Sequence, residues 1–251
     1  MVTDYTVLVR DITSLLVFLY ASIYDWKSRE IDPKVWIPAF IVGIGIDIYQ
    51  VLKFHLNIIQ VISILISLLF LGVIAVLTFI LKHLGGADFL AATALIALYP
   101  YPMMRDYAFL GRYALLPPII GVMVYYTIIV LTHLVYNTSS NLRYINELKK
   151  IPVSRYKKIL FFIVARVMTI EKFKKSKFYF PVYVPNIVDR ISFDVYEDDR
   201  FWKEKLSVLE DSTIIITLWG IPTVTFIGIS LVIYILVGCS PLDVMLYRML
   251  T

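Results

Sequence analysis

Long apolar runs separated by short polar clusters dominate this 251-residue sequence. A hydrocarbon core of about 30 Å needs roughly 17–25 apolar residues in each spanning helix. Six stretches meet this requirement: 6–24, 35–52, 58–82, 88–104, 114–136 and 213–238. The third runs almost unbroken from Ile58 to Leu81, whereas the fourth is short and therefore the weakest. The pattern predicts an all-α polytopic membrane protein with six transmembrane helices.

Composition supports the same class of protein. Apolar residues make up 59% of the chain and charged residues 17%, whereas an ordinary soluble domain is about 45–50% apolar and about 25% charged. The single cysteine, Cys239, excludes an internal disulfide framework and a cysteine-rich zinc module. The first apolar run lacks a preceding basic region and a small-residue cleavage site, so we interpret it as a retained helix rather than a signal peptide.

One long polar segment, residues 137–212, is the only candidate for a soluble domain. Within it, 159–170 predicts an interfacial helix, 177–185 a strand or two interrupted by Pro181, and 190–202 a further strand. These elements favour a small α+β insert between helices 5 and 6. The expected division is therefore a membrane domain over 1–136, the insert over 137–212, and a sixth span with a short tail over 213–251.

Basic residues are distributed unequally between the two sides of six alternating spans. The side that holds the loops 25–34 and 82–88 and the insert carries 19 Lys and Arg, and the other side carries 5. Because basic loops remain cytoplasmic, both termini are expected outside the cell and the insert inside. The insert holds the whole net charge of +5, so the excess indicates contact with anionic lipid headgroups rather than with nucleic acid.

Carboxylates inside or at the edge of a bilayer are costly, so each requires an explanation. Asp25 and Asp88 follow the first and third spans and are therefore expected at one depth, at the cytoplasmic face. Asp11 lies about 21 Å from Asp25 along a helix, beside Arg10, with which we expect it to form a locally compensated pair. For Asp47 we expect a hydrogen bond that stabilises helix packing.

Two carboxylates at one depth can act as a catalytic pair. Close carboxylates do not both ionise cheaply, so one retains a proton while the other acts as a base. Such a pair can activate water against an amide carbonyl without a metal or a nucleophilic side chain. The three histidines, His55, His83 and His133, are scattered and have no metal-ligand spacing. We therefore expect no metal and no cofactor.

The residues before Asp88 are small. Gly85, Gly86 and Ala87 form a turn directly after a long span, and small residues allow a neighbouring helix or an extended substrate to approach the backbone closely. A turn that ends a helix uses similar residues, so the motif alone does not indicate a catalytic site. Its position beside a second acid at the same depth does.

With these residues the sequence resembles a known family. The turn Gly85-Gly86-Ala87-Asp88 resembles the Gly-x-Gly-Asp motif of membrane aspartic proteases, with Ala87 in place of the second glycine. The segment Asp25-Trp-Lys-Ser-Arg-Glu-Ile31 resembles the first-aspartate segment of type IV prepilin peptidases, most closely the archaeal preflagellin/prepilin branch. The resemblance implies that Asp25 and Asp88 are catalytic, and the absence of a cysteine-rich domain implies a peptidase without methyltransferase activity.

The same resemblance implies the substrates, which are archaellin and type IV pilin-like precursors inserted in the membrane and carrying class III signal peptides. Glu30 and Asp32 are candidates for attracting the basic leader, although acids in an exposed loop are more often only solvated. A presenilin-like intramembrane protease stays open as an alternative enzyme. A proton-coupled transporter that uses the two aspartates as a relay stays open as a non-enzymatic alternative.

Overall fold

The computed structural model describes residues 5–54, 56–82, 84–105, 107–110, 113–194 and 197–250. His55, His83 and parts of the expected strand at 190–202 lie outside these residues. The chain folds into two compact units, one formed by 1–129 with 222–251 and the other by 130–221. The fold is mostly helical, with one small antiparallel sheet.

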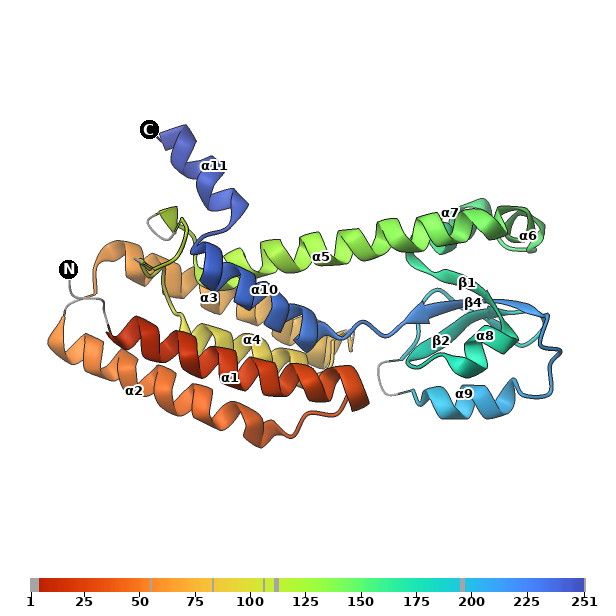
Figure 1. The fold of residues 1–251 in the computed structure, drawn as a ribbon, viewed down its shortest axis with the longest axis horizontal. Coiled ribbons are helices and arrows are strands. Elements are labelled where there is room, and N and C mark those ends of the chain that lie inside the picture. Colours follow the sequence, from red (N-terminus) through yellow and green to blue (C-terminus); the bar gives the residue numbers. More distant parts are fainter. Residues whose placement is uncertain are drawn as a thin grey trace. The chain divides into compact units, whose positions relative to one another are not determined.

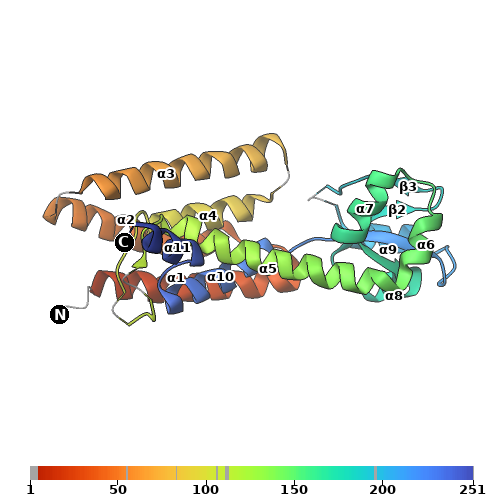
Figure 2. The ribbon, with the colours of Figure 1, turned by 90° about the horizontal axis from the view of Figure 1, so that it is seen from above.

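The first unit is a helical bundle. Its helices are α1 (Tyr5–Ser28), α2 (Ile37–Lys53), α3 (Ile58–Ala75), α4 (Gly86–Leu98), α10 (Thr223–Val237) and α11 (Pro241–Leu250), together with the start of α5 (Pro118–Asn141). A 3-10 turn η1 (Pro33–Trp36) precedes α2, and a π-helical turn η2 (Val76–Ile80) continues α3. α1 packs against α10 and α2, and Figures 1 and 2 show α4 among α1, α2 and α3.

The centre of this bundle is α4. Its Ala91, Ala92, Ala94, Leu95 and Leu98 are fully buried, because small side chains allow the neighbouring helices to approach closely. At the crossing with α2, a Cβ on Gly43 would lie 2.4 Å from the carbonyl oxygen of Ala97. The packing of α4 therefore fixes the helix that carries Asp88 in its first turn.

Among the described residues, four helical segments are long and apolar enough to cross a membrane: Tyr5–Ser28, Pro33–Lys53, Ile58–Ile80 and Pro118–Lys150. A fifth span results if α10 and α11, which are bent by 41° at their junction, count as one. The prediction of a polytopic helical membrane protein is confirmed, but the described residues provide four or five candidate spans rather than the predicted six. At 13 residues α4 is shorter than the predicted fourth span, and it ends at Leu98 rather than at residue 104.

The second unit contains a four-stranded antiparallel sheet in the order β1-β4-β2-β3. The strands are β1 (Arg166–Thr169), β2 (Tyr179–Val184), β3 (Val188–Asp189) and β4 (Ile214–Trp219). The helices of this unit, besides the end of α5 and a 3-10 turn η4 (Leu142–Tyr144), are α6 (Ile145–Lys150), α7 (Arg155–Val164), α8 (Ile170–Lys175) and α9 (Asp199–Lys205).

Both faces of the sheet are buried. Alternate residues of β4 point to opposite sides, so Ile215 joins a core with residues of α8 and α9, and Ile216 joins a core with residues of α6 and α7. Asn141 closes one edge: its Nδ2 donates to the carbonyl of Ala165 at 2.7 Å, and its Oδ1 accepts from the backbone N–H of Val167 at 2.9 Å. The predicted α+β character of this segment is confirmed.

Three predictions of local structure are wrong. The apolar run that begins at residue 213 opens with β4, and α10 starts only at Thr223. A strand buried on both faces is apolar without interruption, so its sequence looks like the start of a membrane helix. The helix predicted over 159–170 ends at Val164 and gives way to β1. The described part of 190–202 contains helix α9 rather than a strand, because α9 is capped by Asp198.

Candidate active site

Asp25 lies in the last turn of α1, and its side chain is buried. Its Oδ2 accepts two hydrogen bonds from Thr225 of α10, one from the backbone N–H at 2.8 Å and one from the hydroxyl at 3.0 Å. Thr225 is the third residue of α10, where backbone N–H groups have no partner inside the helix. The residue before the helix, Pro222, offers no side-chain cap. The carboxylate of α1 therefore caps α10.

Arg29 closes α1 in a left-handed conformation, with φ of 63°. This geometry turns the guanidinium back toward Asp25, one helical turn earlier, and places Nη1 3.6 Å from Oδ1. Burial lowers the pKa of Arg29, and the charges of Asp25 and Asp88 oppose this shift. One cation thus interacts with both carboxylates.

Asp88 is the third residue of α4, in its first turn, and is half-buried. Its Oδ2 accepts from the backbone N–H of Gly85 at 2.9 Å, which is the position of an acidic cap at a helix N-terminus. Among the described residues no hydrogen bond engages its Oδ1, and none joins it to Asp25. The two carboxylates nevertheless repel one another electrostatically, so the ends of α1 and α4 place them in one region.

The small residues before Asp88 do not satisfy a need of the fold itself. Gly85 has an extended backbone with φ of −78°, which any residue adopts. A Cβ on Gly85 would meet only Oδ2 of Asp88, at an ordinary 3.6 Å, and a Cβ on Gly86 would meet no described atom within 4 Å. The surface over this turn is therefore open to an approaching backbone.

The two candidate leader-binding acids differ in their surroundings. Both Glu30 and Asp32 are exposed. Asp32 caps η1, because its Oδ1 accepts from the backbone N–H of Lys34 at 2.9 Å. The Glu30 carboxylate makes no hydrogen bond or ion pair with the described residues, so it alone keeps its full acceptor capacity.

The other acids of the bundle are paired differently from our expectation. Asp11 does not pair with Arg10; it accepts two hydrogen bonds of 2.9 Å from Arg105, and others from Tyr99 and Tyr107. Consecutive residues of a helix do not face each other.

Arg10 instead binds Asp47, at 2.5 Å, and the carbonyl of Leu98. Asp11 and Asp47 are thus each paired with a buried cation, which is typical of a structural role.

Two residues of the site were not predicted from the sequence. Thr225 is about 200 positions away from Asp25, and only the missing cap at the start of α10 hints at it. Tyr126 of α5 interacts with Thr223 and with the charges of both carboxylates. Neither residue has a pattern that would single it out. Within the described part of the chain no cluster of histidine, cysteine and acidic residues has the arrangement of a metal site.

Residues 12–137, half of the chain, match the type IV leader peptidase family. The chain belongs to this family. It is therefore an aspartic-type endopeptidase of the membrane, and its family cleaves the signal peptides of type IV prepilin-like proteins. Membership of this family supports the interpretation as a peptidase and not the alternative of a proton-coupled transporter. A comparison with curated proteins finds no match. The matched segment contains Asp25 and Asp88, whereas Thr225 lies outside it.

Proposed function

We propose that this peptidase removes class III signal peptides from archaellin and type IV pilin-like precursors, with Asp25 and Asp88 as the catalytic pair. The observation that carries the proposal is the contrast among the acids of the bundle. Asp11 and Asp47 each bind a buried arginine at 2.9 Å or less, whereas Arg29 lies 3.6 Å from Asp25. Among the described residues no cation forms an ion pair with Asp88, and the charges of Asp25 and Asp88 act on each other.

The chemistry requires a water and two carboxylates in opposite protonation states. One carboxylate takes a proton from the water as it attacks the scissile carbonyl carbon, and the protonated partner donates to the carbonyl oxygen. The proton is then delivered to the leaving amine. Thr225 and Gly85 each fix one oxygen of these acids, Oδ2 of Asp25 and Oδ2 of Asp88. We propose that the Oδ1 atoms face water and substrate, with Arg29 3.6 Å from Oδ1 of Asp25.

The approach of an extended substrate explains the small residues. The open surface above Gly86 accommodates a peptide backbone that a side chain would hold away. Ala87 adds one methyl group to the turn, and we expect this group to affect the choice of substrate rather than the activity itself. Glu30, exposed and without a cation, is the group that we propose for attracting the basic leader, and Asp32 adds its charge from the cap of η1.

The substrate enters from the membrane. Its apolar helix lies in the bilayer, and its leader emerges at the cytoplasmic face, where the distribution of basic residues predicts the ends of α1 and α4 to lie. The second unit is expected on the same side, with both termini outside. No methyltransferase activity is expected.

The test is cleavage of a pre-archaellin by the full chain in membranes, with the new N-terminus of the product sequenced. Asp25→Asn and Asp88→Asn are each expected to abolish leader removal and to leave membrane insertion intact. Glu210→Gln, an exposed acid of the second unit, is the matched control and retains activity. Processing at the wild-type rate by either Asn variant would contradict the assignment of the pair.

A presenilin-like specificity would give products cut inside the apolar segment. A cut between the basic leader and the apolar segment is therefore part of the expected result. The reaction is also expected to resist chelators, and loss of activity with a chelator would point to a metal-dependent mechanism instead.

A further inference from the structure

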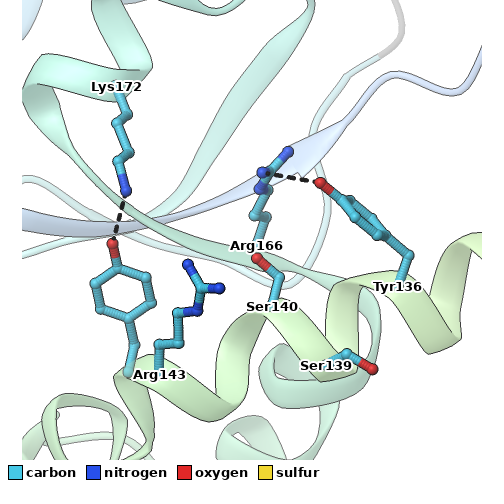
Figure 3. A pocket seen from close by; sticks show the side chains of 7 residues that line it. Tyr136, Ser139, Ser140, Arg143, Arg166 and Lys172 are labelled. Atoms are coloured by element: carbon cyan, nitrogen blue, oxygen red, sulfur yellow. Dashed lines mark hydrogen bonds between the residues drawn. The ribbon is translucent and has the colours of Figure 1, made fainter.

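A cavity of about 330 Å³ lies in the second unit, between the end of α5, the 3-10 turn that follows it, β1 and α8. Seven residues line it: Tyr136, Ser139, Ser140, Arg143, Tyr144, Arg166 and Lys172. Three are cations, four carry hydroxyl groups, and none is acidic. Figure 3 shows Arg143, Arg166 and Lys172 reaching the cavity from different elements, with the Ser140 hydroxyl between Arg143 and Arg166.

The three cations have no acidic partner within 4.0 Å among the described residues. The neighbouring lysines of α8, by contrast, are paired: Lys174 binds Asp211 at 2.7 Å, and Lys175 binds Glu171 at 2.6 Å. On one six-residue helix, the lysine that faces the cavity is thus left with its charge uncompensated, and the two that face elsewhere are neutralised.

Neutral tyrosines orient two of the cations. The ammonium of Lys172 donates to the Tyr144 hydroxyl at 3.1 Å, and Arg166 donates to Tyr136 at 3.4 Å and to Tyr179 at 2.9 Å. Phenols hold these side chains in place without cancelling their charge. The cavity therefore presents positive charge, and the ligand that its lining fits is an anion.

The chemistry of the lining favours a phosphate group. Guanidinium groups donate two parallel hydrogen bonds to phosphate oxygens, and an ammonium and a hydroxyl complete a set of donors around a tetrahedral anion. The Ser140 hydroxyl makes no hydrogen bond with any described residue, whereas the Ser139 hydroxyl is engaged by the carbonyl of Val135. A basic leader peptide does not fit such a cavity, because like charges repel.

The position along α5 indicates the source of the phosphate. α5 begins at Pro118 and belongs to a candidate span. Tyr136 follows 18 residues later, which is about 27 Å along a helix and close to the thickness of the hydrocarbon core. Tyrosine and basic side chains concentrate at this depth, where lipid headgroups lie.

We propose that this cavity is a binding site for the phosphate of an anionic lipid headgroup, held by Arg143, Arg166 and Lys172. The site is separate from the aspartate pair, and the inference does not depend on the proposed proteolytic function. It makes one lipid molecule a specific ligand of the second unit, in place of a diffuse attraction of basic residues to the membrane.

The experiment uses the full chain in detergent micelles and counts bound lipid by native mass spectrometry during titration with dioctanoyl phosphatidylglycerol. The double variant Arg143→Gln with Lys172→Gln is expected to weaken binding at least tenfold. Both positions are exposed, so the fold is expected to persist. The matched control, Lys174→Gln with Lys175→Gln, removes the same charge from the same region and is expected to change the affinity less than twofold.

Three outcomes would overturn the inference. The first is an equal loss of affinity in the control, which would show that only total charge matters. The second is equally tight binding of dioctanoyl phosphatidylcholine, which carries no net charge. The third is displacement of the lipid by inorganic phosphate at the same concentration, which would assign the cavity to a soluble phosphate compound instead. Tight binding of phosphatidylglycerol without any of these three outcomes supports the proposed lipid site.

Discussion

Thr225→Val tests whether the link between α1 and α10 serves the chemistry. The substitution preserves the shape of the side chain and the backbone N–H that donates to Asp25, but it removes the hydroxyl that lies 3.0 Å from Oδ2. A hydrogen bond to a charged group contributes about 1.5–3 kcal/mol. This one is weaker than most, because the single proton of the Thr225 hydroxyl is shared with the carbonyl of Ser22, also at 3.0 Å.

We therefore take the lower end of that range, about 1.5 kcal/mol, which corresponds to a roughly tenfold change in rate if the bond orients Asp25 for attack. The expected result is about tenfold slower leader removal from a membrane-inserted precursor. The measurement is the initial rate of cleavage at equal amounts of folded enzyme.

Two controls make the result specific to this bond. Thr225→Ser restores the hydroxyl and is expected to restore most of the rate. Thr127→Val removes a hydroxyl that binds only a carbonyl of its own helix, that of Met123, and is expected to be neutral. A wild-type rate for Thr225→Val, or an equal loss for Thr225→Ser, would refute the positioning role of this hydroxyl.

Three further predictions concern stability. Gly43→Ala is expected to lower the free energy of unfolding by about 1–3 kcal/mol, because its methyl would overlap a backbone oxygen of α4. The measurement is the Tm in detergent. Gly45→Ala on the same helix meets nothing within 4 Å and is the control. Asp11→Asn leaves Arg105 buried without its charge partner, so the free energy of unfolding is expected to fall by about 3–5 kcal/mol. Burial acts to raise the pKa of Glu197, but its hydrogen bonds from Arg190, Asp194 and Trp202 lower it below the ordinary 4.5. The stability from this ionised group is present above that value and is lost as the pH falls. The hydrogen-exchange protection factors of 197–206, which are relative to the intrinsic rate at each pH, are therefore expected to fall in acid, and to fall less in Glu197→Gln.

The sequence predicted the polytopic membrane class, because that class depends on counting residues against a fixed bilayer thickness. The shared depth of the two aspartates rests on the same counting and stays a prediction. The sequence failed where two structures share one pattern. The apolar run of β4 (Ile214–Trp219) resembles the beginning of a span, and only the partner strands distinguish the two. The composition of the segment does not contain that information.

The pairing of charges depended on contacts between helices. The sequence suggested Arg10 with Asp11 because they are adjacent, but a turn of 100° per residue separates their directions, and each finds a partner on another segment. Thr225 was missed for the same reason, since the acceptor that caps α10 comes from the other end of the chain. Pairings at long range follow from the packing of helices rather than from local pattern.

The cap that Asp25 forms on α10 also has a consequence for the order of events during synthesis. Asp25 leaves the ribosome about 200 residues before Thr225, which at 5–20 residues per second is a delay of about 10–40 s. During that interval α1, α2, α3 and α4 can insert, yet the Asp25 carboxylate does not have its hydrogen-bond partner from α10. A nascent or truncated chain therefore carries both aspartates in an incomplete site, and the finished C-terminal part of the protein is what assembles the enzyme.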